Sequence, residues 1–144
     1  MKYRNILLAT DLSGNSKKAA ERARIIADNC QAQLHIVHVI EHSPIAFGGE
    51  FSIPMDIHLE QTIEQTASQA LAKKGYQLNI SSDHQHLLNG TVKHQVLELA
   101  EKLRIDLIVV GTHGHHGFDI LLGSRANAIL HGATCDVLAV RADE

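Results

Sequence analysis

Residues 106–111 read DLIVVG, a short apolar run that ends in glycine. A continuous apolar run of this length is typical of a strand buried on both faces, as central strands of parallel sheets are. Residues 5–10 read NILLAT and predict a second strand of the same kind. Two such strands, far apart in the sequence, indicate an α/β protein with a parallel sheet.

The segments around these two runs alternate between helical and strand-like patterns. They predict helices over residues 17–30, 55–74, 92–103 and 124–131, and further strands over 33–40, 83–88 and 134–140. Gly75 and Gly132 are predicted to end two of the helices, and Ser13, Asn15 or Ser16 to cap the first. The polar run 83–88 is placed at a sheet edge. The order predicts one doubly wound, flavodoxin-like domain over residues 1–144, with five parallel strands ordered 3-2-1-4-5 and helices on both faces.

Composition excludes several classes of function. The 144 residues are 44% hydrophobic but only 3% aromatic, and the formal net charge is -3. A nucleic-acid-binding protein usually presents a basic face or aromatic stacking platforms. No apolar run approaches the roughly 18 residues of a membrane span, and no signal-peptide pattern precedes the first strand. With two cysteines far apart in the sequence, we expect a cytoplasmic protein without nucleic-acid or membrane partners.

The candidate binding site lies where two predicted strands end. In open α/β sheets, ligands bind beyond the carboxyl ends of the strands, at the point where the strand order reverses. Residues 9–11 follow one buried strand and residues 111–114 follow the other. Glycines there would let backbone amides approach a phosphate, and a helix starting at Ser124 would add its positive end. The alternative is that the glycines only turn the chain and Gly123 only precedes a helix cap.

Four segments together resemble the universal stress protein family: residues 2–13, His38-Val39, residues 106–111 and Gly123-Ser124. The resemblance covers essentially the whole chain and implies the adenine-nucleotide alpha hydrolase-like version of the fold. ATP-binding members carry Gly, two residues, Gly, nine residues, and Gly followed by Ser or Thr. Here residues 111–124 match both ends of that motif, but only eight residues, 115–122, lie between its last two glycines.

The resemblance implies a site for ATP, with or without Mg²⁺, that is made from these residues: Ala9, Thr10, Asp11, Val39, Gly111, His113, Gly114, Gly123, Ser124 and Arg125. By the same resemblance, Asp11 would hold adenine or ribose, and Ala9 and Val39 would line the adenine pocket. The three residues from 111 to 114 would approach the ribose and phosphates, and the last three would bind phosphate. For Asp11 the alternative is capping of its own loop or helix, and Val39 is expected in the core with or without nucleotide.

Three functions follow from the resemblance. The first is a dimeric, ATP-binding stress-response regulator, whose second copy would cover the apolar edge strand at residues 135–140. The second is a dimeric interaction protein without nucleotide, which the shortened glycine motif favours. The third and weakest is a slow ATPase, since Ser124 has no partnered base that the sequence identifies and no catalytic residue is assigned.

Eleven histidines raise the question of a metal site. His113, His115 and His116 cluster in one segment, and His84 and His86 share one face of a predicted strand. A pair spaced in this way can ligate zinc. No cysteine or carboxylate stands beside either group at metal-site spacing, so we expect no metal site.

Overall fold

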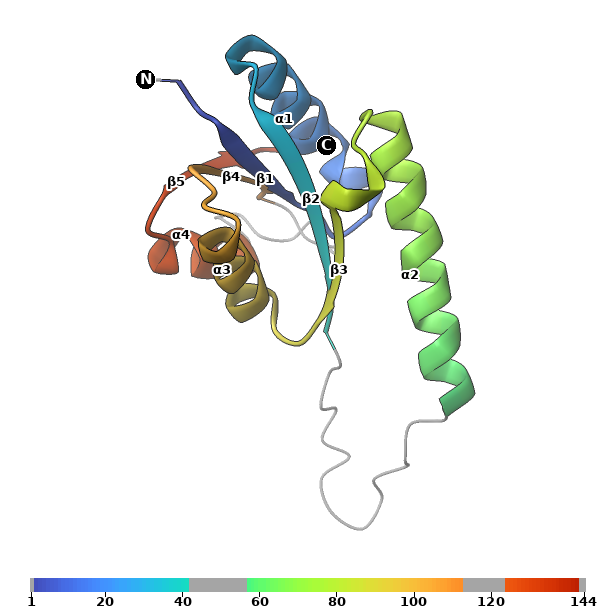
Figure 1. Cartoon of the computed structure of the whole chain (residues 1–144). Coiled ribbons are helices and arrows are strands. Elements are labelled where there is room, and N and C mark those ends of the chain that lie inside the picture. Colours follow the sequence, from blue (N-terminus) through green and yellow to red (C-terminus); the bar gives the residue numbers. More distant parts are fainter. Residues whose placement is uncertain (1, 42–56, 113–123, 143–144) are drawn as a thin grey trace.

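The computed structural model describes residues 2–41, 57–112 and 124–142, without the side chains of Ile57 and Ser124. Five parallel strands form one sheet in the order β3-β2-β1-β4-β5, which confirms the predicted fold (Figure 1). The strands are β1 (Asn5–Ala9), β2 (Gln33–Ile40), β3 (Gln85–Asn89), β4 (Leu107–Gly111) and β5 (Asp136–Val140). The polar strand β3 lies at an edge, as predicted, and β5 forms the other edge.

Four α-helices cover the two faces of the sheet. They are α1 (Lys17–Cys30), α2 (Ile57–Gln77), α3 (Val92–Lys102) and α4 (Ser124–Gly132). Alternate side chains of β1 divide between two apolar layers, because successive residues of a strand point to opposite faces. Ile6 and Leu8 pack in the layer under α1 and α2, and Leu7 packs in the layer under α3 and α4. Within the described ranges, no helix combines the length and the apolar character that crossing a bilayer requires.

The prediction that Gly75 ends the second helix is wrong. Helix α2 runs through Gly75, where a Cβ would overlap the side chain of Gln85, so the glycine permits close packing against β3. Asn79 makes the left-handed turn instead, with a φ of 58°. The amide of Ile80 donates to the carbonyl oxygen of Gly75 at 2.8 Å, which closes the end of the helix.

Two further local predictions need correction. Ser16 occupies the cap position of α1, but its side chain makes no capping bond and its hydroxyl donates to the carbonyl oxygen of Ser13 at 2.6 Å. His84 lies in a short 3₁₀ turn, η2 (Ser82–His84), and only His86 is on β3. The two histidines therefore do not form the strand pair that their spacing predicted.

Candidate functional site

The carboxyl ends of β1 and β4 lie side by side, as the strand-end rule predicts. Ala9 is level with Val110 of β4 and with Val37 of β2. From β1 the chain moves outward through β2 to β3, and then crosses to β4 on the other side of β1. The strand order therefore reverses between β1 and β4, and Thr10 and Gly111 directly follow the paired residues Ala9 and Val110.

The described residues leave open space over Gly111. A Cβ placed on it would have only one neighbour within 4 Å among the described residues, the carbonyl oxygen of Asn15 at 4.0 Å. Its φ lies outside the left-handed range that favours glycine. Neither packing nor backbone geometry in the described residues thus requires a glycine here. The space is available to a group that approaches the backbone from outside.

Thr10 shapes the first strand end through contacts of its own. Its amide donates to the carbonyl oxygen of Val37 at 3.0 Å, and its hydroxyl oxygen accepts from the amide of Leu12 at 2.9 Å. Nδ1 of His38 lies 2.9 Å from the Thr10 carbonyl oxygen. Because a carbonyl only accepts, this nitrogen carries the proton. Thr10 is 8% exposed, so it is buried just after the carboxyl end of β1.

Asp11 is engaged within its own loop. Its Oδ1 accepts from the amide of Ser13 at 2.9 Å and from the Ser13 hydroxyl at 2.6 Å. This is the loop-capping arrangement that the sequence offered as an alternative to ligand binding. A contact between Asp11 and adenine or ribose stays a prediction.

The two apolar residues assigned to the adenine pocket differ in burial. Val39 is 6% exposed and belongs to the apolar layer under α3 and α4, so it is part of the core, as expected. Ala9 is half-buried at the end of β1 and packs against the same layer. Only Ala9 presents an appreciable surface at the strand end.

Arg125, assigned to phosphate, is held by a carboxylate. Its guanidinium donates to Oε1 of Glu41 at 2.5 Å, and Oε2 of Glu41 accepts from the amide of Val92 at 3.1 Å. Glu41 directly follows β2, Val92 begins α3, and Arg125 lies in the first turn of α4. One side chain therefore joins the carboxyl end of a strand to the starts of two helices.

Part of the predicted site lies outside the described residues. This applies to His113, Gly114 and Gly123, to the neighbouring His115 and His116, and to the side chain of Ser124. The backbone of Ser124 begins α4, as predicted. The assignments of these residues to ribose or phosphate stay predictions.

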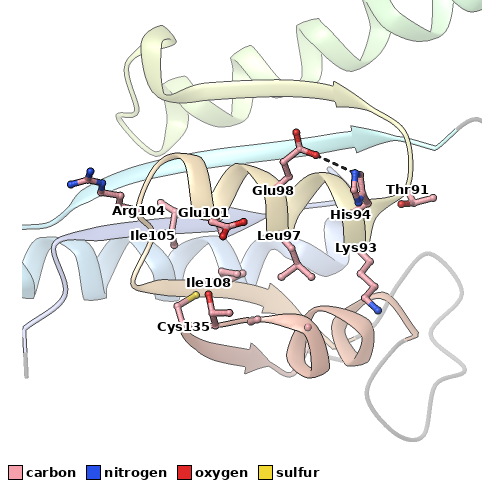
Figure 2. A pocket seen from close by; sticks show the side chains of 14 residues that line it. Thr91, Lys93, His94, Leu97, Glu98, Glu101, Arg104, Ile105, Ile108 and Cys135 are labelled. Atoms are coloured by element: carbon pink, nitrogen blue, oxygen red, sulfur yellow. Dashed lines mark ion pairs between the residues drawn. The ribbon is translucent and has the colours of Figure 1, made fainter.

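A groove of about 770 Å³ lies away from the strand ends, along α3 and beside β5 (Figure 2). Leu97, Ile105 and Cys135 supply apolar lining, and Glu101 and Arg104 supply charge. Burial raises the pKa of the Cys135 thiol, with the carboxylates of Asp136 and Asp106 adding to the effect. This groove does not coincide with the site predicted from the sequence, because none of the residues assigned to that site lines it.

Three histidines meet towards the amino ends of β2 and β3, away from the carboxyl ends of β1 and β4. Nδ1 of His35, on β2, lies 3.2 Å from Nε2 of His86, and the ring centroids of His35 and His84 are 4.2 Å apart. Burial, together with the charges of His84 and His86, lowers the pKa of His35 to about 4. Among the described residues, no group of three or more His, Cys, Asp or Glu has a geometry that could hold a metal ion.

Sequence reasoning missed Glu41 and His38 as site residues. Glu41 had the same signal as Asp11, since each is a carboxylate just beyond a buried strand. The strand-end rule, applied to β2 as it was to β1, would have found it. No sequence signal marks the bond between His38 and Thr10, because it depends on the register of β1 against β2.

Comparisons with known proteins give a consistent result. The sequence model of the universal stress protein family matches residues 2–141. The chain is 62% identical, over 97% of each sequence, to universal stress protein A homolog 1 of Coxiella burnetii. Its structure is similar to that of UspA from Lactobacillus plantarum, with a TM-score of 0.80 and 25% identity over 98% of this chain and 99% of the other. It also resembles a universal stress protein solved in complex with cAMP, with a TM-score of 0.67 and 24% identity over 98% of each chain.

Proposed function

The chain belongs to the universal stress protein family, and from that premise we propose that it binds an adenine nucleotide at the carboxyl ends of β1 and β4. ATP with Mg²⁺ is the proposed ligand, and a cytoplasmic, dimeric stress-response regulator is the proposed role. The open space over Gly111 carries the proposal, because a residue without a Cβ stands where nothing in the described structure needs one. The family member solved with cAMP, an adenine nucleotide, supports the choice of ligand class.

Each part of this strand end has a chemical task in the proposal. The backbone at Gly111 approaches the ribose and phosphates without steric hindrance. The start of α4 offers free amides and the positive end of a helix dipole, and Arg125 adds a charge. A ligand that binds only the native state stabilises it by mass action. Nucleotide binding would therefore change the stability of the protein and its choice of partner.

Replacing Gly111 with valine should weaken ATP binding and preserve the fold. The new side chain enters open space in a strand, where a β-branched residue is favoured, but it occupies the position of the ligand. We expect Kd to rise about tenfold or more, the equivalent of at least ~1.4 kcal/mol of lost contact. Calorimetric titration of nucleotide-stripped protein with Mg-ATP measures the change.

Ala72→Val is the matched control, because residue 72 lies on the exposed face of α2, on a different element from either strand end. Thermal unfolding of both variants shows whether the fold is kept. Equal affinities for parent and Gly111→Val would move the site away from Gly111. No binding by the parent at millimolar ATP would leave the dimeric interaction protein as the function, which the shortened glycine motif favours. ATP turnover in the same sample would favour the third function, that of a slow ATPase.

The proposed dimer uses β5, as the sequence suggested. In the described sheet β5 pairs only with β4, which leaves its outer edge open. Val137, Leu138 and Ala139 are only partly buried, although they lie in the middle of the strand. An apolar edge strand of this kind invites pairing with another strand, and a second copy of the chain supplies one of equal length.

Val137→Lys should convert the proposed dimer into a monomer. The aliphatic stem of lysine can still cover the apolar layer, and its ammonium group remains in water at the open edge. Burying that charge against a second copy is unfavourable, so the dimer dissociation constant should rise by about 100-fold or more. Sedimentation equilibrium measures it, with the exposed Lys73→Ala as control. A Val137→Lys protein that unfolds like the parent and still dimerises would exclude β5 as the interface.

A further inference from the structure

The carboxylate of Glu41 occupies a position that also suits a phosphate group. It accepts one hydrogen bond from the first amide of α3 and one from the guanidinium of Arg125 in the first turn of α4. Helix N-termini favour anions, because their amides are unpaired and the helix dipole is positive there. Here the anion is part of the chain itself. Glu41 stands directly after β2, the neighbour of β1 in the sheet.

The strength of this ion pair suits an exchange of partners. The side chain of Arg125 is 53% exposed and that of Glu41 is 32% exposed. Solvent-exposed pairs contribute only about 0–1 kcal/mol, so an incoming phosphate can displace Glu41 from Arg125. The second carboxylate oxygen can stay on the Val92 amide during the exchange, because the two bonds use different oxygens.

We propose that Glu41 competes with the phosphate groups of the nucleotide for the guanidinium of Arg125. It holds Arg125 in the ligand-free protein and yields that guanidinium when a polyphosphate binds. This inference rests on the proposed nucleotide site and goes beyond it, since it assigns a regulating residue that opposes binding. The affinity of the site is therefore set below what Arg125 and the start of α4 alone would give.

Glu41→Gln tests the proposal with little change of shape. Glutamine keeps an oxygen that can accept from the Val92 amide, but it removes the charge that competes for Arg125. We expect Mg-ATP to bind about three- to tenfold more tightly to Glu41→Gln than to the parent. Arg125→Gln should bind more weakly than the parent. In the Arg125→Gln background, the gain from Glu41→Gln should fall below about twofold, because the partner of the competition is gone.

Glu98→Gln is the matched control. It removes the same charge, also breaks an ion pair, with His94 at 3.1 Å, and lies on α3 with a side chain 67% exposed. Its affinity for Mg-ATP should stay within about twofold of the parent. An equal gain for Glu98→Gln and Glu41→Gln would mean that only the overall charge matters, and would overturn the proposal. So would a Glu41→Gln protein that binds more weakly than the parent.

Tripolyphosphate, titrated into the parent, Glu41→Gln, Arg125→Gln and the double variant, separates this inference from the proposed function. It carries phosphate charge without adenine or ribose. Tighter tripolyphosphate binding by Glu41→Gln, lost when Arg125 is also replaced, supports the competition. If ATP binds no better than tripolyphosphate, the adenine site is excluded but the competition is not. ATP binding that is unaffected by Glu41→Gln sinks the competition alone. If no variant binds either probe, both proposals fail.

Discussion

Replacing Leu7 with alanine is expected to lower the free energy of unfolding by about 2–5 kcal/mol. Leu7 is 0% exposed in the central strand β1, level with His35 on one side and Ile108 on the other. Neighbours that belong to paired strands cannot move in to fill the space, because the register fixes their positions. The loss therefore combines the transfer free energy of the removed atoms with the free energy of an unfilled cavity. Urea denaturation at neutral pH measures it.

Leu59→Ala makes the same chemical change on the surface. Leu59 is 51% exposed on α2, so its truncation should alter the free energy of unfolding by less than about 0.5 kcal/mol. The contrast between the two variants tests whether the core lies where the fold places it. A Leu7→Ala protein as stable as Leu59→Ala would mean that β1 is not the centre of the packed sheet.

Strands β1 and β4 could be predicted from sequence because they are buried on both faces. Such strands read as continuous apolar runs, and residues 5–10 and 106–111 are of this kind. The ends of α1, α3 and α4 were predicted to within one residue, but the backbone turns after the helices were not. Left-handed turns follow three helices and are made by Gln31, Asn79 and Arg104, none of them glycine. Only Asn79 is of a residue type that favours this conformation, so the sequence gives no local sign of the turns at Gln31 and Arg104.

The place of the candidate site could be predicted, but the state of its polar groups could not. The strand-end rule placed Thr10 near Gly111, and the register pairs Ala9 with Val110, the residues that directly precede them. The rule did not predict that Thr10 makes hydrogen bonds to Leu12 and His38 within the protein. It also did not predict that Arg125 pairs with Glu41, 84 positions away. Such long-range pairs depend on how α4 sits over the sheet, which spacing along the chain does not encode.

The histidines show the same division between local pattern and tertiary contact. The spacing of His84 and His86 predicted a pair on one face of a strand. The buried member of the group is instead His35, on the neighbouring strand β2. His35 is 6% exposed, and its Nδ1 faces Nε2 of His86 at 3.2 Å. Two neutral imidazoles can share that bond, one as donor and one as acceptor. Once both are protonated, both nitrogens are donors and repel each other.

Acidification from pH 7 to pH 4 should therefore destabilise the protein through His35. Burial and the charges of His84 and His86 hold the folded pKa of His35 at about 4, below the value of about 6.5 in an unfolded chain. Burial, His84 and Lys102 also lower the pKa of His86. Between these two pH values the unfolded chain binds a proton that the native protein does not. The free energy of unfolding should fall as the pH falls, by about 3 kcal/mol from His35 between pH 7 and pH 4.

His35→Leu removes the titrating group and should flatten the stability profile between pH 6.5 and pH 4, whatever its effect at pH 7. Urea denaturation at several pH values gives the difference between variant and parent, in which the contributions of the carboxylates cancel. His94→Gln is the control, because it removes an imidazole whose side chain is 71% exposed on α3. Parallel profiles for His35→Leu and the parent would show that His35 is protonated as readily in the folded protein as in the unfolded chain. The histidine group lies at the amino ends of β2 and β3, so this loss of stability arises at the opposite end of the sheet from Gly111 and should occur with or without nucleotide.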